Sequence, residues 1–383
     1  MNIVQKFGGT SVGSSARIRR CASLIEREIL NNNFPCVVVS AMSGQTNMLL
    51  NLTEGFHGAA GSPFSDLVAS TGEVVSSGLL ALALHEIGIQ AQPLSCWQVP
   101  ILTDQTFGNA KIIDIFPQKI KKLMREGIVP VITGFQGMTL EYEVTTLGRG
   151  GSDTSAVAIA AAIGAQRCDI YTDVDGIYSA DPRFVPQAIR HESLPYDIAM
   201  EMASLGSKVL HSRCVEIAKR YGMPLRVLSS FNDAPGTHIT QEVFMENKII
   251  SSITHTRDMV WVTFPQATFH HFLETFTKLS AEFDMLQLNQ ETFGCSLSLE
   301  TWGKISSFLE KPLELQTNLS RISLIGQGLR GNPEVLQKTL KIMKDLPIKA
   351  IDMTQARLSL LTRCDTPEIL VQTLHDALIL KKD

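Results

Sequence analysis

Short, β-branched apolar runs alternate with helix-patterned segments from residue 1 to about residue 231, and this alternation is the strongest constraint on the fold. Strand runs bounded by Gly, Pro or Asn occur at residues 3–4, 37–39, 129–133, 168–172 and 225–228. Helix-compatible segments occur at residues 18–29, 74–85, 112–124 and 156–163. Strands separated by helices predict a mainly parallel sheet covered on both faces, with ligands at the carboxyl ends of its strands.

A second organisation follows a turn-rich cluster at residues 232–236 and a polar segment through residue 248. A small α+β unit is predicted by strand runs at 249–254, 259–264, 285–288 and 295–299 with a helix near 270–281. The pattern then repeats, with strand runs at 322–325, 349–353 and 357–362 and helices at 333–344 and 367–380. Because 383 residues exceed the size of a single core, we predict a larger first domain followed by this diverged repeat.

Composition narrows the classes of function. A formal net charge of −4 provides no basic footprint for nucleic acid and no polybasic patch for a membrane surface. The seven cysteines are scattered without a CxxC pair, which indicates reduced intracellular thiols rather than a zinc site or a disulfide framework. The chain enters its first strand directly, and no run approaches the roughly 18 apolar residues of a membrane span. We therefore expect a cytoplasmic protein.

A lysine, a glycine pair and two hydroxyls follow the first strand run, as Lys6, Gly8, Gly9, Thr10 and Ser11. Glycines let backbone N–H groups approach a polyanion, the lysine adds a positive charge, and hydroxyls can donate to phosphoryl oxygens or cap a helix. A P-loop of the form GxxxxGKS/T is absent from the sequence. This segment is therefore the first candidate for a phosphate cradle.

A Gly-rich loop at residues 148–154 leads into an apolar helix. Its glycines again permit close backbone approach, and the helix N-terminus favours an anion. Arg149 can bind a carboxylate through two N–H groups, and Ser152 or Asp153 can cap the helix. An ordinary Gly-rich turn with an N-cap explains the same residues.

Three further residues are candidate substrate contacts. Ser40 and Thr46 follow the strand run 37–39 and place small hydroxyls at a strand end. Glu73 begins a helix, where it either accepts from a substrate ammonium group or only complements the helix dipole.

Acidic, aromatic and basic residues follow the strand run 168–172. Asp173 and Asp175 can hold Mg²⁺ through water, Tyr178 can stack on an adenine, and Arg183 can reach a phosphate. The alternative is an Asp-Gly turn with solvated charges. Lys208 lies near a helix start, where a surface lysine is common.

Taken together, these segments resemble the aspartate kinase branch of the amino acid kinase family. The resemblance covers residues 1–240, where the segments that occur in the family's order are VQKFGGTSV, VVVSAMSGQTN, STGE, ILTD, TTLGRGGSDTSA, IYTDVDGIYSADPR, SLGSKVLHSRCVEIA and LRVLSSF. It implies an α/β, three-layer amino acid kinase fold with a mainly parallel sheet over this first domain.

The resemblance also implies residue roles for a transfer of the ATP γ-phosphoryl group to the β-carboxylate of L-aspartate, giving L-aspartyl-4-phosphate on the route to diaminopimelate and lysine, threonine and methionine. Catalysis falls to Lys6, Asp153 and Lys208. Substrate binding falls to Ser40, Thr46, Glu73, Arg149, Ser152 and Asp153. ATP binding falls to Lys6, Gly8, Gly9, Thr10, Ser11, Thr172, Asp173, Tyr178, Arg183 and Lys208. Mg²⁺ is the expected cofactor with ATP, and no protein metal ligand is assigned.

The segment Gly326–Gly331 fits GxGxxG and has Asp352 about 20 residues further on, which is typical of a dinucleotide site. Only 52 residues follow Gly331, too few for the paired halves of such a fold. The region instead resembles a pair of ACT regulatory domains, small α+β ferredoxin-like units, at residues 249–318 (degenerate) and 319–383. The second unit matches well through RISLIGQGLRGNPEVLQKTL.

The ACT resemblance implies a homodimer formed through these domains. It does not extend to lysine or threonine feedback, since residues 264–267 and 353–357 depart from the family at effector-binding positions. His270 and His271 are adjacent on a helix and do not face one another, so no metal site is expected there.

Two other functions stay open. Another amino acid kinase, acting on glutamate or a carbamate, is one; Glu73 together with Arg149 favours an α-amino acid whose two α groups are both bound. A catalytically silent amino-acid-binding subunit is the other, and the intact Lys6, Asp153 and Lys208 argue against it.

Overall fold

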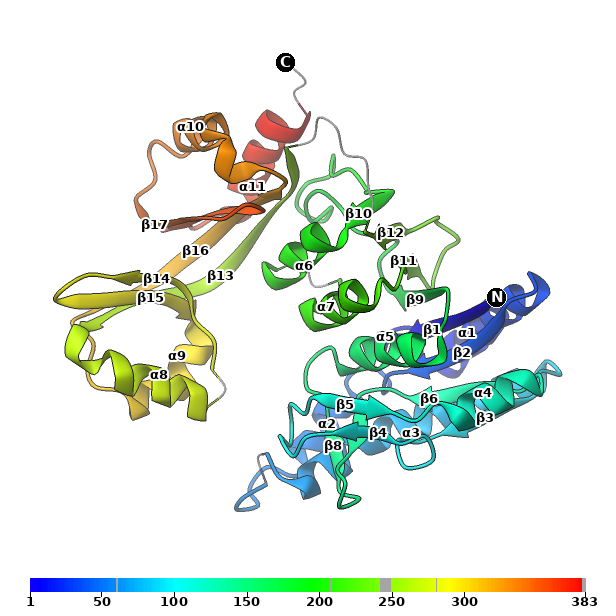
Figure 1. Cartoon of the computed structure of the whole chain (residues 1–383). Helices are drawn as coiled ribbons and strands as arrows, with labels where there is room; N and C mark the ends of the chain where they lie inside the picture. Colours follow the sequence, from blue (N-terminus) through cyan, green and yellow to red (C-terminus); the bar gives the residue numbers. More distant parts are fainter. Residues whose placement is uncertain (60, 207–208, 242–248, 280, 381–383) are drawn as a thin grey trace. The chain divides into compact units, whose positions relative to one another are not determined.

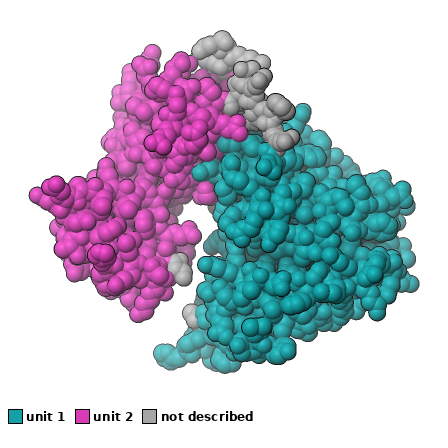
Figure 2. Space-filling view, viewed as in Figure 1, with its two compact units in different colours: residues 1–177, 190–203, 208–244 teal, residues 178–189, 204–207, 245–383 magenta. Residues whose placement is uncertain are grey.

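The computed structural model describes residues 1–59, 61–206, 209–241, 249–279 and 281–380. The chain divides into two compact units (Figure 1, Figure 2). Unit 1 comprises residues 1–177, 190–203 and 208–244, and unit 2 comprises residues 178–189, 204–207 and 245–383.

Unit 1 is built on an eight-stranded sheet with the strand order β10-β12-β11-β9-β1-β2-β6-β3. Its strands are β1 (Asn2–Phe7), β2 (Phe34–Val39), β3 (Ala91–Leu94), β6 (Val129–Thr133), β9 (Arg167–Thr172), β10 (Ser193–Pro195), β11 (Leu225–Ser229) and β12 (Thr237–Thr240). Neighbouring strands pair in parallel except β11 with β12, which are antiparallel. The predicted mainly parallel sheet is confirmed.

The helices of unit 1 cover both faces of this sheet. They are α1 (Ser15–Leu30), α2 (Gln45–Asn51), α3 (Pro63–Glu86), α4 (Gln118–Arg125), α5 (Gly151–Ile163), α6 (Tyr196–Ser204) and α7 (Ser212–Tyr221). On β1, Phe7 points into the core that α1 and α3 share with the sheet. The preceding residue, Lys6, points to the opposite face and reaches Asp153 of α5. This alternation along one strand places α1 and α3 on one face and α5 on the other, which gives the three layers.

A second, four-stranded sheet in unit 1 corrects one sequence prediction. Its order is β5-β4-β7-β8, with bounds β4 (Ile101–Thr103), β5 (Ile112–Ile115), β7 (Gln136–Met138) and β8 (Val144–Thr146). The prediction of a helix over residues 112–124 is wrong for its first part, because residues 112–115 pair with β4 instead. Pro117 restricts Phe116 to extended conformations, and α4 starts only after it.

Helix α3 is, among the described residues, the one helix long and apolar enough to cross a membrane by length and composition. It begins at Pro63, well before the predicted start, because the Ser62 hydroxyl caps it by accepting from the Ser65 N–H. Its most apolar 18-residue window is 56% buried. Two acidic side chains, Asp66 and Glu73, are buried along it. These features are typical of a core helix of unit 1.

Unit 2 contains one antiparallel six-stranded sheet with the order β14-β15-β13-β16-β18-β17. Its strands are β13 (Ile250–Pro265), β14 (Asp284–Leu288), β15 (Thr292–Ser298), β16 (Glu314–Gly326), β17 (Ile348–Met353) and β18 (Arg357–Thr362). Its helices are α8 (Phe269–Lys278), α9 (Leu299–Ile305), α10 (Pro333–Ile342) and α11 (Pro367–His375). Among the described residues, three apolar cores lie along this sheet: one around Phe264 and Phe272, one around Ile253 and Leu324, and one around Trp261 and Leu319.

The long strand β13 contributes to all three of these cores, and β16 contributes to those around Ile253 and around Trp261. The two runs predicted at 249–254 and 259–264 are one strand, because register shifts between Thr256 and Trp261 bend β13 without ending it. Strand β16 likewise runs across the expected boundary at residues 318 and 319. The division into 249–318 and 319–383 therefore remains a proposal, as does the first domain at 1–240.

The GxGxxG segment does not form a dinucleotide fold. It follows β16, which is antiparallel to both of its neighbours, β13 and β18. Gly326 has a different reason to be glycine: an added Cβ would lie 1.7 Å from the Ile249 carbonyl oxygen. At Gly326 the backbone of this segment passes close to the backbone of Ile249, within unit 2.

Candidate active site

A pocket of about 240 Å³ opens in unit 1 beside the carboxyl ends of β1 and β2 and the N-terminus of α5. It gathers Lys6 and all six side chains that the sequence predicts for substrate binding. Its lining residues are Lys6, Ser40, Ala41, Thr46, Glu73, Phe135, Gly148, Arg149, Gly150, Gly151, Ser152 and Asp153. Residues up to about 150 positions apart in sequence thus meet where parallel strands end, as expected for this class of sheet.

A buried ion pair forms one wall of this pocket. Strand β1 presents Lys6 and the first turn of α5 presents Asp153, with 2.5 Å between Nζ and Oδ1. Each residue is only 8% exposed. The carboxylate therefore compensates the ammonium charge and holds it at the pocket, where it can meet an incoming anion.

The glycine pair after β1 packs tightly against the loop that follows β2. A Cβ added to Gly9 would lie 2.7 Å from the Ala41 carbonyl oxygen, so a larger residue does not fit there. The Gly8 N–H already donates to the Tyr171 carbonyl. Among the backbone hydrogen bonds between described residues, the N–H groups of Gly9 and Thr10 donate to no acceptor. The N–H groups of Gly9 and Thr10 are therefore available as donors to an anion, whereas that of Gly8 is used within unit 1.

Glu73 lies in the same pocket and is 2% exposed. Its Oε1 accepts from the Ala41 N–H at 2.9 Å, while Oε2 has no hydrogen-bond partner among the described residues. Burial raises the pKa of Glu73 to about 7, although the Ala41 N–H opposes this shift. An unpartnered, buried carboxylate oxygen is suited to accept from a substrate ammonium group.

Glu73 makes the stability of the protein depend on pH. Its carboxyl has an unfolded pKa near 4.5 and a folded pKa of about 7, so the folded state binds more protons between these values. Stability should therefore fall as pH rises from about 4.5 to 7, by roughly 2 to 3 kcal/mol. Glu73→Gln keeps the acceptor for Ala41 and removes the titration. We expect thermal unfolding of this variant to lose that part of the pH dependence, and an unchanged profile would contradict the assigned protonation.

The loop that carries Arg149 has the backbone of a glycine-dependent turn. Gly148 and Gly150 adopt φ values of +74° and +69°, and a Cβ on Gly150 would lie 2.3 Å from the Cβ of His211. Arg149 is exposed between them, while Ser152 in the first turn of α5 is buried. The guanidinium is thus free of the core and available to a carboxylate at the pocket mouth.

The predicted ATP-binding residues from Thr172 to Arg183 are divided between the two units. Thr172 ends β9, and its hydroxyl donates to the Asp173 carboxylate at 3.1 Å, both in unit 1. Tyr178 and Arg183 belong to unit 2, where Arg183 pairs with Asp181. Lys208 lies outside the described residues. The roles given to these five residues stay predictions.

Phe135 lines the pocket and is a site residue that the sequence reasoning missed. It follows β6 in the left-handed region, with φ +67°, which is costly for a bulky side chain. Its N–H donates to the Ser155 hydroxyl of α5, which holds the strained turn. The sequence signal, a Gly-Phe pair directly after a buried strand, is too common to indicate a site by itself.

Comparisons with known proteins identify the family of this chain. The model of the amino acid kinase family matches residues 1–229. The aspartokinase of Geobacillus stearothermophilus is 38% identical, over 98% of this chain and 96% of its own length. The chain belongs to the aspartokinases of the amino acid kinase family. The aspartate kinase of Pseudomonas putida is 39% identical, over 98% of this chain and 97% of its own.

Aspartokinase III of E. coli, solved in complex with aspartate and ADP in its R-state, superposes with a TM-score of 0.84 at 25% identity. The match covers 100% of both chains. The predicted family and fold class are confirmed: an amino acid kinase domain with a mainly parallel sheet, followed by ACT-like α+β domains.

Proposed function

We propose that this aspartokinase transfers the γ-phosphoryl group of ATP to the β-carboxylate of L-aspartate, giving L-aspartyl-4-phosphate and ADP. The observation that carries the proposal is the single pocket in which the Lys6–Asp153 pair lies with Glu73 and Arg149. The names of the relatives and the aspartate and ADP bound to the E. coli enzyme support the same reaction.

The pocket offers a partner for each charged group of L-aspartate. The Arg149 guanidinium binds the α-carboxylate through paired N–H groups, and the unpartnered Oε2 of Glu73 accepts from the α-ammonium. The β-carboxylate is then left for reaction. Since its solution pKa is near ~3.9, it is already ionised at neutral pH and needs no general base.

The chemical step joins two anions and therefore depends on positive charge. A β-carboxylate oxygen attacks the γ-phosphorus, the bond from that phosphorus to the bridging β,γ-oxygen breaks, and ADP leaves with the electron pair. Lys6 and the N–H groups of Gly9 and Thr10 stabilise the charge on the transferred group. Lys208 and the residues Thr172, Asp173, Tyr178 and Arg183 bind the nucleotide in this proposal.

Mg²⁺ fits the donor set at the end of β9. The Asp173 carboxylate lies beside the Thr172 hydroxyl at a strand end, and an oxygen ligand of this kind is what Mg²⁺ takes when phosphates and water complete its shell. When bound with ATP, Mg²⁺ neutralises phosphate charge. Asp173 would hold it, through water or directly.

We also propose a homodimer formed through the ACT-like domains and a cytoplasmic location. The six-stranded sheet of unit 2 ends in β14 and β17, and exposed apolar side chains lie on these edges, among them Leu286, Leu288 and Ile351. The seven cysteines are free thiols, as a reducing compartment favours. Native mass spectrometry of the full chain tests the dimer, and a monomer at micromolar concentration would contradict it.

Substrate specificity tests the proposed reaction. ADP formation should be measured with ATP, Mg²⁺ and either L-aspartate or L-glutamate. We expect turnover with L-aspartate; turnover with L-glutamate alone would instead indicate another amino acid kinase. Absence of turnover with both would favour the silent amino-acid-binding subunit.

Arg149→Ala should raise the KM for L-aspartate by about 10- to 100-fold with a smaller change in kcat, since a charge-assisted pair to the α-carboxylate is lost. Arg149→Lys keeps the charge but not the paired N–H groups, so its KM for L-aspartate should lie between those of the wild type and Arg149→Ala. Steady-state kinetics at saturating ATP measures both. A wild-type KM for L-aspartate in Arg149→Ala would contradict the assignment of Arg149 to the aspartate site.

A further inference from the structure

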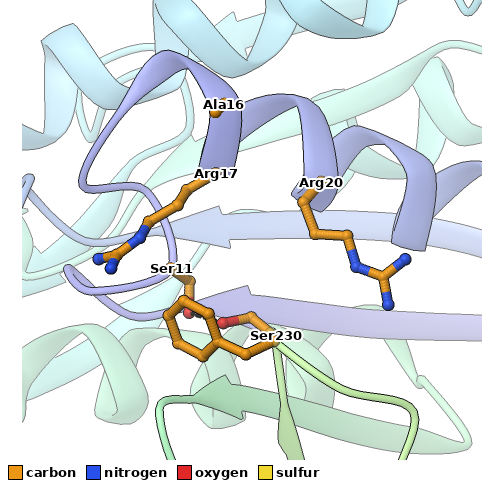
Figure 3. Close-up of a pocket in the computed structure, with 6 residues that line it drawn as sticks. Ser11, Ala16, Arg17, Arg20 and Ser230 are labelled. Atoms are coloured by element: carbon orange, nitrogen blue, oxygen red, sulfur yellow. Dashed lines mark hydrogen bonds between the residues drawn. The ribbon is translucent and has the colours of Figure 1, made fainter.

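A second pocket lies in unit 1 beside the first turns of α1 and the carboxyl ends of β1 and β11. It contains Ser11, which is predicted to bind ATP, and the proposed reaction gives its other lining residues no ligand. Its volume is about 290 Å³, and it is lined by Ser11, Ala16, Arg17, Arg20, Ser230 and Phe231. Figure 3 shows the guanidinium groups of Arg17 and Arg20 flanking the hydroxyls of Ser11 and Ser230. The lining thus has two cations and no carboxylate, which favours an anion.

Both arginines retain donors for a ligand. Arg17 donates from Nη1 to the Thr10 carbonyl at 2.9 Å, and its Cζ lies 4.9 Å from the centre of the Phe231 ring. Arg20 pairs through Nη2 with Asp233, whose side chain is 64% exposed. A guanidinium has five N–H donors, so each of these bonds to described residues uses only part of that capacity. The Arg20–Asp233 pair is exposed and weak enough for an incoming anion to compete with it.

The two serines add buried hydroxyls between the arginines. Ser11 is 1% exposed and Ser230 is 3% exposed, and their Oγ atoms lie 2.8 Å apart. Ser230 can also donate to the Thr172 carbonyl at 3.2 Å. Phe231, which is 46% exposed, adds an apolar ring at the pocket wall.

We propose that this pocket binds a small phosphate monoester, with the phosphate on Arg17, Arg20 and the two hydroxyls and the apolar remainder against Phe231. Arginine pairs suit phosphate because planar guanidinium groups match two phosphate oxygens at once. A serine hydroxyl has one O–H, so Ser11 or Ser230 adds a donor when it turns this O–H from its present partner toward the phosphate. The aromatic ring distinguishes an ester from inorganic phosphate.

Occupancy of this pocket reaches the phosphoryl-binding loop. Ser11 donates its N–H to the Gly8 carbonyl at 2.9 Å, and Arg17 holds the Thr10 carbonyl. A ligand that contacts Ser11 and Arg17 therefore changes the hydrogen bonds that hold the turn from Gly8 to Ser11. Because this turn belongs to the phosphoryl-binding loop, the ligand alters turnover. This coupling rests on the proposed function, whereas the binding itself does not.

Calorimetric titration of the full chain with phenyl phosphate and with inorganic phosphate tests the site. We expect saturable binding of both, tighter for phenyl phosphate, and a loss of about tenfold in affinity for Arg20→Ala. Arg20→Lys should lie between, and Phe231→Ala should remove the preference for the ester. Arg19→Ala is the matched control, since Arg19 lies on the same helix but pairs with Glu86 of α3, and it should bind as the wild type does.

Absence of saturable binding to the wild type, or equal affinities for Arg20→Ala and Arg19→Ala, would overturn the proposal. These measurements need no kinase activity, so they fail or succeed independently of the proposed reaction. The effect on catalysis is read separately, as the change in kcat/KM for ATP when phenyl phosphate is added. An unchanged value at saturating phenyl phosphate would contradict the coupling to the Gly8–Ser11 turn.

Discussion

Replacing Lys6 with Met should lower kcat by about 10³-fold or more, because it removes a preorganised positive charge from the transferring phosphoryl group. The same change should also destabilise the protein. Lys6 and Asp153 are 2.5 Å apart, and each is 8% exposed, so the variant leaves a buried carboxylate without its partner. Breaking a buried pair in this way costs about 3 to 5 kcal/mol.

A double variant separates these two effects. Lys6→Met with Asp153→Asn removes both charges of the pair, and we expect it to recover most of the lost unfolding free energy without recovering kcat. Denaturant unfolding and ADP formation measured on the same preparations give the comparison. Recovery of activity together with stability would show that Lys6 serves the fold rather than the phosphoryl group.

Asp169→Asn should lower the unfolding free energy of the protein by about 3 kcal/mol, because Asp169 is the fully buried centre of a charge network. Its carboxylate on β9 accepts from Arg226 of β11 at 2.6 Å and from Arg167 at 3.1 Å. Both arginines also contact Glu28 of α1, at 3.4 and 2.8 Å. The network thus ties two strands and a helix together, and we expect the midpoint of thermal unfolding to fall by about 6 to 12 °C.

An exposed ion pair in the same unit provides the control for this prediction. Glu86 of α3 pairs with Arg19 of α1 at 2.8 Å, with both side chains more than half exposed. Exposed pairs of this kind are screened by water and contribute little, so Glu86→Ala should leave the unfolding midpoint unchanged. Equal changes in the unfolding midpoint for Asp169→Asn and Glu86→Ala would show that the buried network contributes no more to stability than an exposed ion pair.

Some elements could be predicted because local pattern and tertiary pairing agree. The runs 129–133 and 357–362 are short, apolar and bounded by turn residues, and they are β6 and β18 with the same bounds. Residues 112–115 are different: their apolar spacing also fits a helix, and only pairing with β4 makes them a strand. Strands of three or four residues, such as β3 and β7, carry too little pattern to detect.

The candidate site follows the same division. Lys6 and Asp153 could be named from sequence because each stands beside the end of a strand or the start of a helix in a parallel sheet, where ligands bind. The prediction that Glu73 begins a helix is wrong, because α3 starts at Pro63 and Glu73 lies in its middle, so only the family resemblance pointed to this residue. The buried Oε2 of Glu73 and the strained backbone of Phe135 depend on packing between distant segments. No local pattern encodes them.

The assignment of residues 178–189 to unit 2 also could not be predicted from the sequence. This segment carries Tyr178 and Arg183, which the resemblance assigns to ATP, yet Ala180 and Val185 pack in a core with Ile253 and Leu374 of unit 2. The Ser179 hydroxyl lies 2.8 Å from Nε2 of the buried His375. Contacts over nearly 200 residues of sequence decide this placement, and composition or periodicity cannot reveal them.

Trapping the product tests the central claim most directly. The full chain is incubated with ATP, Mg²⁺, L-aspartate and hydroxylamine, and the hydroxamate is identified by mass spectrometry and compared with authentic α- and β-aspartyl hydroxamates. The proposed reaction predicts the β-hydroxamate, formed in proportion to ADP and lost in Lys6→Met. Formation of the α-hydroxamate, or of ADP without any hydroxamate, would contradict an acyl phosphate at the β-carboxylate.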